Sequence, residues 1–133
     1  MTNQTAATLR IESVDHVSVL VADVVAAAQF YQTVLGLSEV PRPDLGFPGA
    51  WLTLAYGVDL HLLQLPNPDS IHERPTHGGR DRHVALRVAA TAPFAERLTA
   101  RNWPFTRSYS GRDALFFRDP DGNAWELVAR ADL

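Results

Sequence analysis

Apolar residues alternate with polar ones near the start of the chain and then recur at helical spacing. Residues 14–21 are rich in β-branched side chains, which predicts a strand buried on at least one face. Apolar positions follow at three- and four-residue spacing over 24–35, behind Asp23, a good helix N-cap. Gly36 then predicts the end of the helix, because glycine adopts left-handed backbone conformations without a Cβ clash.

Shorter runs after this helix predict strands and turns. A short apolar piece spans 37–40, and two β-rich runs span 50–55 and 58–65 with a hairpin turn at 56–57. From 66 to 82 the composition changes to Pro, Asn, Asp, His, Gly and Arg with little periodicity. We therefore expect a connecting segment there and no regular element.

The same order of elements then returns. A strand is expected over 83–88 and a helix from Thr91, a possible N-cap, to Arg101, with Asn102 in the place of Gly36. The remaining strands are expected at 104–109, 114–118 and 124–129, the last behind an Asp-Pro-Asp-Gly turn. Each half therefore reads β-α-β-β-β, and the matching helix ends indicate the repeat of a whole supersecondary unit.

Composition narrows the classes of function. With 133 residues and 46% hydrophobic content, we expect one domain, residues 1–133, with a single core. A net charge of −3 with scattered Lys and Arg argues against a nucleic acid partner. Cysteine is absent, so a metal must be held by His, Asp or Glu. No apolar run has membrane length and no leader pattern precedes the first strand, so we expect a cytoplasmic protein that binds no membrane.

Four polar residues stand at matched positions in the two halves. His16 and His83 each begin the first strand of a half, while His61 and Glu126 each lie inside its last, otherwise apolar strand. A buried carboxylate needs a partner or a metal. Each histidine alone is more simply a satisfied core or edge-strand residue. The four together, in a chain without thiolates, predict a divalent metal site made of His16, His61, His83 and Glu126.

The chain is identified as a member of the vicinal oxygen chelate superfamily, which includes glyoxalase I, epimerases, extradiol dioxygenases, fosfomycin-modifying enzymes and bleomycin-resistance proteins. The resemblance covers residues 13–130. Three motifs carry it: Asp-His-Val-Ser-Val at 15–19 with Leu-Gly-Leu at 35–37, Arg-His-Val-Ala-Leu at 82–86, and Phe-Arg-Asp-Pro-Asp-Gly-Asn at 117–123 followed by Trp-Glu-Leu at 125–127.

The resemblance implies an α+β fold of two tandem βαβββ modules whose curved mixed sheets form a cup, with the helices outside. Module 1 would span about 13–66, a linker 67–81 and module 2 about 82–130. It also implies one divalent metal ion (Zn, Ni, Co, Mn or Fe(II)), commonly in a homodimer. His16, His83 and Glu126 match the two-histidine, one-glutamate set of dioxygenase-like and fosfomycin-like members. His61 stands where glyoxalase I-like members place a glutamate.

The expected function is that of a glyoxalase-like lyase or isomerase on a small substrate chelated through adjacent oxygens, with Glu126 transferring a proton. Arg87 and Phe116 are candidate substrate contacts, although Phe116 stands where fosfomycin transferases are expected to carry a tyrosine. An extradiol-type dioxygenase is one alternative, with His72 or His77 as an added acid or base. A non-catalytic, antibiotic-type binding protein and a structural dimerisation module are the others.

Overall fold

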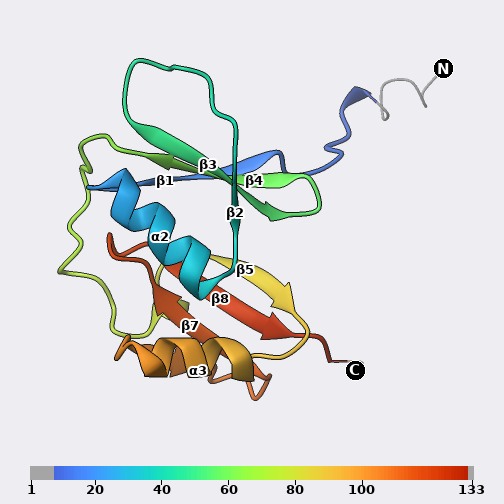
Figure 1. Ribbon diagram of the computed structural model, residues 1–133. Helices are drawn as coiled ribbons and strands as arrows, with labels where there is room; N and C mark the ends of the chain where they lie inside the picture. The colour runs from blue at the N-terminus through green and yellow to red at the C-terminus, as the bar shows by residue number, and fades with distance from the viewer. Residues whose placement is uncertain (1–7, 132–133) are drawn as a thin grey trace.

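Two four-stranded mixed sheets, each with one helix, make up the computed structural model, which describes residues 8–131 (Figure 1). Sheet A belongs to the first half, with β1 (His16–Leu20), α2 (Val24–Val34), β2 (Ser38–Val40), β3 (Gly49–Ala55) and β4 (Val58–Leu63). Sheet B belongs to the second half, with β5 (His83–Val88), α3 (Ala92–Ala100), β6 (Phe105–Arg107), β7 (Ala114–Arg118) and β8 (Ala124–Ala129). The predicted pair of βαβββ modules is confirmed.

Both sheets have the same strand order. Sheet A runs β1-β4-β3-β2 and sheet B runs β5-β8-β7-β6, with the first and last strands of each module paired in parallel. The first strand of each module is therefore an edge strand. This pairing places Ser18 opposite His61 in sheet A and Ala85 opposite Glu126 in sheet B.

The helices begin and end close to where the sequence predicts. The Asp23 carboxylate accepts hydrogen bonds from two backbone N–H groups in the first turn of α2. Gly36 and Asn102 both have positive φ, 69° and 54°, just after the two helices. Thr91 precedes α3 but does not cap it, because its hydroxyl donates to Asp113 Oδ1 at 2.6 Å instead. None of the described helices is long and apolar enough to cross a membrane.

One hydrophobic core joins the two modules. In Figure 1, α2 lies between the two sheets, and its Phe30 and Tyr31 contact the rings of Phe117 and Trp125 in sheet B. The fully buried residues come from both halves: Tyr31, Val34, Leu52, Leu60, Leu62, Leu98, Leu115, Trp125 and Leu127. The apolar faces of both sheets thus turn toward the helices, and the histidine-bearing faces turn away from the core.

The Asp-Pro-Asp-Gly turn ties module 2 to module 1. The Tyr31 hydroxyl donates to Asp119 Oδ2 at 2.5 Å and accepts from Trp125 Nε1 at 2.9 Å. Asp121 Oδ1 accepts the backbone N–H of Ala22 at 2.9 Å. Burial raises the pKa of Tyr31, and the neighbouring Asp119 raises it further. Burial also raises the pKa of Asp119, against the hydrogen bonds that hold its charged form.

The connecting segment contains more structure than its composition predicts. Residues Gly78–Arg80 form a short 3-10 helix, η1, that packs against β7 and β8. Asp81, directly after it, accepts hydrogen bonds from Arg74 at 2.9 Å and from Arg118 at 2.8 Å. Hydrogen bonding to Arg74 first, and then to Arg118, holds the pKa of Asp81 well below its usual range. The segment therefore covers part of sheet B.

Candidate functional site

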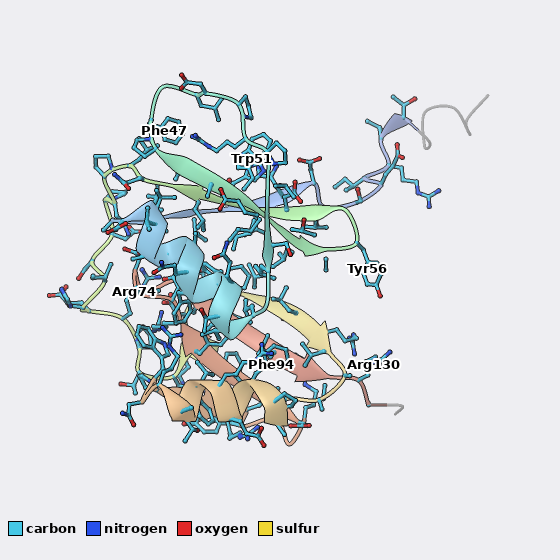
Figure 2. The ribbon with its side chains drawn as sticks, viewed as in Figure 1. Phe47, Trp51, Tyr56, Arg74, Phe94 and Arg130 are labelled. Atoms are coloured by element: carbon cyan, nitrogen blue, oxygen red, sulfur yellow. The ribbon has the colours of Figure 1, made fainter. Side chains whose placement is uncertain are left out.

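Three rings stack in a column on the outer face of sheet A. The His61 ring lies 4.2 Å from Trp51 at 6° and 4.0 Å from His16 at 15°, measured between ring centroids and planes (Figure 2 labels Trp51). Adjacent strands β3, β4 and β1 supply the three residues. Burial lowers the pKa of His61, and the neighbouring His16 lowers it further. The His16 side chain stays 41% exposed at the free edge of the sheet.

A buried carboxylate marks the equivalent face of sheet B. Glu126 lies 6% exposed in β8, with His83 Nε2 at 3.2 Å from Oε1 and Arg112 Nη2 at 3.3 Å from Oε2. The sequence predicts that this carboxylate needs a partner, and the structure supplies two. Arg112 reaches it from the loop between β6 and β7.

The hydrogen bonds of His16 and His83 fix the same tautomer at both positions. His83 Nδ1 lies 2.9 Å from the Asp81 carbonyl oxygen, and His16 Nδ1 lies 2.7 Å from Asp15 Oδ2. Both partners are acceptors, so Nδ1 must donate and Nε2 is left with its lone pair in the neutral ring. Metal-bound histidines typically make this second hydrogen bond to a carbonyl or carboxylate.

The His83 and Glu126 pair fits a cation. The Nε2 lone pair and Glu126 Oε1 lie 3.2 Å apart, and two acceptors at this distance need a proton or a metal ion between them. Adjacent ligands of one ion, each about 2.1 Å from it, have a similar separation. The donor types and their geometry in module 2 therefore fit half of a divalent metal site.

The four predicted ligands form two pairs rather than one cluster. Lone pairs of imidazole nitrogens lie in the ring plane, so the nearly parallel rings of His16 and His61 do not point at one common ion. Across residues 8–131, no three His, Asp or Glu side chains come together closely enough to hold a metal. The structure thus joins His83 to Glu126 and His16 to His61, but leaves the pairs apart.

The two predicted substrate contacts lie on the same face of sheet B. Arg87 is exposed in β5, four residues beyond His83, and its side chain makes no hydrogen bond or ion pair with any described residue. Phe116 is opposite Glu126 in β7 and buried, with its ring edge-to-face against His83 at 5.2 Å and His77 at 4.7 Å. Phe116 therefore forms an apolar floor beneath the polar residues.

Sequence reasoning did not predict how three neighbouring residues contact these side chains. Arg112 lies in a polar loop, and no hydrophobic periodicity there predicts its contact with Glu126. His77 Nδ1 lies 2.6 Å from Thr106 Oγ1, a pairing that depends on how the connecting segment folds back. The sequence partly predicts that Trp51 lies near His61, since the two residues lie on strands expected to form a hairpin.

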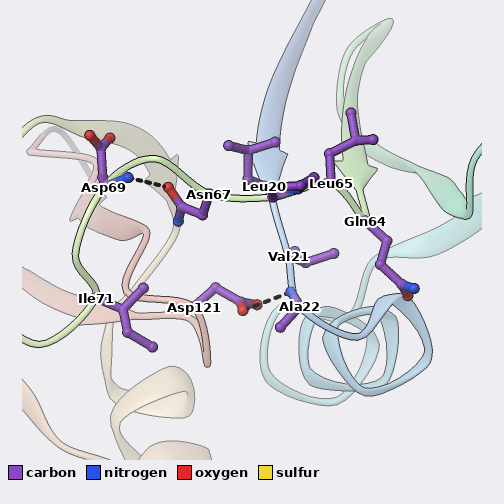
Figure 3. A pocket seen from close by; sticks show the side chains of 10 residues that line it. Leu20, Val21, Ala22, Gln64, Leu65, Asn67, Asp69, Ile71 and Asp121 are labelled. Carbon is purple, nitrogen blue, oxygen red and sulfur yellow. Dashed lines mark hydrogen bonds between the residues drawn. The ribbon is translucent and has the colours of Figure 1, made fainter.

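One sizeable cavity lies away from the candidate ligands. It has a volume of about 470 Å³ and opens where the end of β1 meets the connecting segment, lined among others by Leu20, Gln64, Ile71 and Asp121 (Figure 3). A smaller cavity of about 210 Å³ lies between β1 and β5 and reaches both Ser18 and His83. None of the four candidate ligands lines the 470 Å³ cavity.

Comparison with known proteins gives a family and a fold. The model of the Glyoxalase/Bleomycin resistance protein/Dioxygenase superfamily matches residues 13–127. "Glyoxylase I 4" of Arabidopsis thaliana is 33% identical over an alignment of 125 residues, and the match covers 90% of this chain and 71% of that protein.

Two solved structures extend the fold comparison. A variant of the fosfomycin resistance protein FosX of Listeria monocytogenes, complexed with Mn(II) and 1S,2S-dihydroxypropylphosphonic acid, aligns with a TM-score of 0.72 at 19% identity over 92% of this chain and 95% of that one. The antibiotic binding protein TnmS3 of Streptomyces sp. CB03234 aligns with a TM-score of 0.71 at 21% identity over 92% and 99%. At these identities the likeness is one of fold.

Proposed function

The chain belongs to the Glyoxalase/Bleomycin resistance protein/Dioxygenase superfamily, and from this premise we propose a divalent-metal-dependent enzyme of the lyase or isomerase class. Its substrate would be a small molecule bound through two adjacent oxygens. One observation carries the proposal. His83 Nε2 lies 3.2 Å from Glu126 Oε1, while Nδ1 of the same ring donates to the Asp81 carbonyl and leaves Nε2 facing the carboxylate.

His16, His83 and Glu126 are the proposed ligands for Zn, Ni, Co, Mn or Fe(II). His61 is the fourth proposed ligand, and binding through it requires its ring to leave the stack between Trp51 and His16. A divalent ion in this site would supply a Lewis acid that stabilises negative charge on a substrate oxygen. Imidazole and carboxylate suit all five ions, and the choice between them needs a measurement.

Glu126 is the proposed proton-transferring base. Its burial removes competing water, and Arg112 on Oε2 holds the carboxylate in one orientation. A base there would take a proton from a substrate carbon and return it to a neighbouring atom. Phe116 would shield that exchange from below, and Arg87 would meet an anionic group of the substrate.

We further propose that two copies of the chain complete one site. The described chain leaves the His16 pair and the His83 pair apart, and both lie on faces turned away from the core. A homodimer that joins sheet A of one copy to sheet B of the other would bring the pairs together. By symmetry such a dimer would contain two equivalent sites.

Metal content tests the proposed cofactor. Protein purified without a metal-affinity tag should contain or take up about one divalent ion per chain, as measured by elemental analysis. The double variant His83→Ala/Glu126→Ala should lose this metal, whereas His72→Ala, at an exposed histidine of the connecting segment, should keep it. Wild-type protein that takes up no stoichiometric metal would contradict the proposal.

Mixing two defective variants tests the shared site. His16→Ala/His61→Ala and His83→Ala/Glu126→Ala should each lose metal. After subunit exchange in a mixture, about a quarter of the sites should be intact, because half of the dimers are mixed and each carries one complete site. No recovery, with a metal-replete wild type, would place the whole site in a single chain.

The aromatic column favours a second candidate function. Trp51, His61 and His16 form a flat stack that would bind a planar ligand by stacking alone, as in a non-catalytic binding protein. A planar ligand that raises the thermal unfolding temperature of His83→Ala/Glu126→Ala, but not that of Trp51→Ala, would favour this function.

Activity assays separate the two enzyme classes. Oxygen uptake by Fe(II)-loaded protein would favour the dioxygenase chemistry, and hemithioacetal isomerisation would favour the lyase class.

A further inference from the structure

The outer face of sheet B carries two guanidinium groups beside a single buried carboxylate. Arg87 lies on this face by strand alternation, and Arg112 comes over the same face from the β6–β7 loop to reach Glu126. Glu126 balances one of these positive charges, and Arg87 has no charged partner among the described residues. The face therefore holds a cation that the protein itself does not neutralise.

The Arg112 guanidinium has N–H donors that no described residue uses. Its Nη2 contacts Glu126 Oε2 through one long contact of 3.3 Å, and its Nε donates to Ser110 Oγ, also at 3.3 Å. Its side chain is 59% exposed, and no hydrogen bond engages Nη1 within residues 8–131. Arginine has five N–H donors in a planar fork that matches a carboxylate or phosphonate, so this guanidinium can bind Glu126 and a second anion together.

The loop holds Arg112 in place from behind. Ser110 Oγ accepts from the Arg112 backbone N–H as well as from Nε, and the hydroxyls of Ser108 and Ser110 lie 2.7 Å apart. Gly111 supplies the positive φ of 84° that turns the chain back toward the sheet. A guanidinium braced in this way loses less side-chain freedom when it binds a ligand.

We propose that Arg112 and Arg87 form a clamp for the anionic group of the substrate, so that the site prefers carboxylates or phosphonates over neutral molecules of the same shape. This specificity rests on the proposed function, because it places the charged end of the substrate beside Glu126. Arg107 is the natural control. It lies opposite Leu115, whose side chain is in the core, and so belongs to the other face of sheet B, paired with Asp113.

Glycolate and glycolamide test the clamp, since both present adjacent oxygens and only glycolate is charged. NMR titration of the arginine Nε–Hε signals, with and without Zn(II), should show glycolate shifting Arg112 and Arg87 but not Arg107. Glycolate should bind about tenfold more weakly to Arg112→Gln, as expected for loss of a charge-assisted contact, and less so to Arg112→Lys. Arg107→Gln should match the wild type.

Several outcomes would overturn the clamp. Equal affinity for glycolate and glycolamide, unchanged binding in Arg112→Gln and Arg87→Gln, or an equal loss in Arg107→Gln would each do so. Metal uptake without anion preference would refute the clamp alone. Conversely, a shift of the Arg112 signal by glycolate in protein that takes up no metal would refute the proposed metal enzyme and leave the anion site standing.

Discussion

The two modules share a chain path but treat their outer faces differently. In module 1 the face of sheet A is open, with His16 41% exposed at the edge and His61 held by ring stacking alone. In module 2 the equivalent face holds Glu126 at 6% exposure, beneath the connecting segment and the loop of Arg112. The two modules have the same element order and strand order, and they differ in what covers the outer face of each sheet and in its charge.

The difference has a physical cause in the residues that precede module 2. Asp81 and its two arginines fasten the connecting segment to sheet B, so that Gly78 packs on the side chains of Phe116 and Ala124. A carboxylate tolerates burial only with partners, and this cover is where His83 gains its carbonyl acceptor from Asp81. A histidine needs no such cover, which is why sheet A can stay open.

Phe116 and Trp51 occupy equivalent positions, opposite Glu126 and His61, and their truncation should have the most unequal effect. Phe116→Ala removes a buried ring and should lower the free energy of unfolding by about 4 kcal/mol. Trp51→Ala removes a half-buried ring and should cost about 1 kcal/mol. Urea denaturation measures both, and equal losses would show that the two faces are covered alike.

Replacing Asp81 should loosen the connecting segment and leave the outer face of sheet B less covered, as the outer face of sheet A is. Asp81→Asn should cost about 2 kcal/mol at pH 7, because two charge-assisted hydrogen bonds weaken. Arg74 and Arg118 hold the pKa of Asp81 below its usual 3.8. Its stabilisation is therefore complete above that value and is lost as the pH falls toward the folded-state pKa.

Urea denaturation at several pH values should therefore show the wild type and Asp81→Asn becoming closer in free energy of unfolding as the pH is lowered below 3.8. Asp69→Asn, at an exposed pair with Arg82, is the control and should change stability little at any pH. A difference between wild type and Asp81→Asn that stays constant in acid would contradict this account.

Tyr31 tests whether the modules unfold together. Tyr31→Phe removes the hydroxyl between Asp119 and Trp125 and should cost about 1.5 kcal/mol. Because the core is shared, calorimetry should still show one transition. Tyr56→Phe, at a fully exposed tyrosine, should leave the curve unchanged. Two separate transitions would mean that the modules are less coupled than their core implies.

The residues that end the two helices, Gly36 and Asn102, should show the smallest difference in stability on substitution. Gly36→Ala should cost about 1 kcal/mol, because alanine is strained at a φ of 69°. Asn102→Gly should be neutral or slightly stabilising, since glycine tolerates the φ of 54° at least as well. Thermal melting of the two variants checks the ranking, and an equal loss in both would show that side-chain contacts of Asn102 matter more than backbone strain.

The sequence predicts the frame well because periodicity and turn chemistry are local. Strands 83–88, 114–118 and 124–129 match the structure to the residue, and both helix ends lie at the expected left-handed positions. The faces that carry His83 and Glu126 also follow from strand alternation.

Contacts between segments could not be predicted in the same way. A regular hairpin around 56–57 would place Leu52 opposite His61, but a bulge between Thr53 and Ala55 shifts the register by one and brings Trp51 there. Arg112 and His77 reach the site from irregular segments, where side-chain positions depend on tertiary packing. The separation of the His16–His61 pair from the His83–Glu126 pair likewise depends on how the sheets are oriented around α2.

The parallel pairing of first and last strands sets the order in which the chain can mature during synthesis. β1 can pair only after β4 has been synthesised, and β5 only after β8. Neither sheet is therefore complete until its own final strand has left the ribosome. Sheet A is then complete while module 2 is still unmade, with the apolar side chains of α2 that later meet Phe117 and Trp125 uncovered. The nascent chain should therefore bind a chaperone that recognises apolar surface at this stage, and release it when β8 emerges.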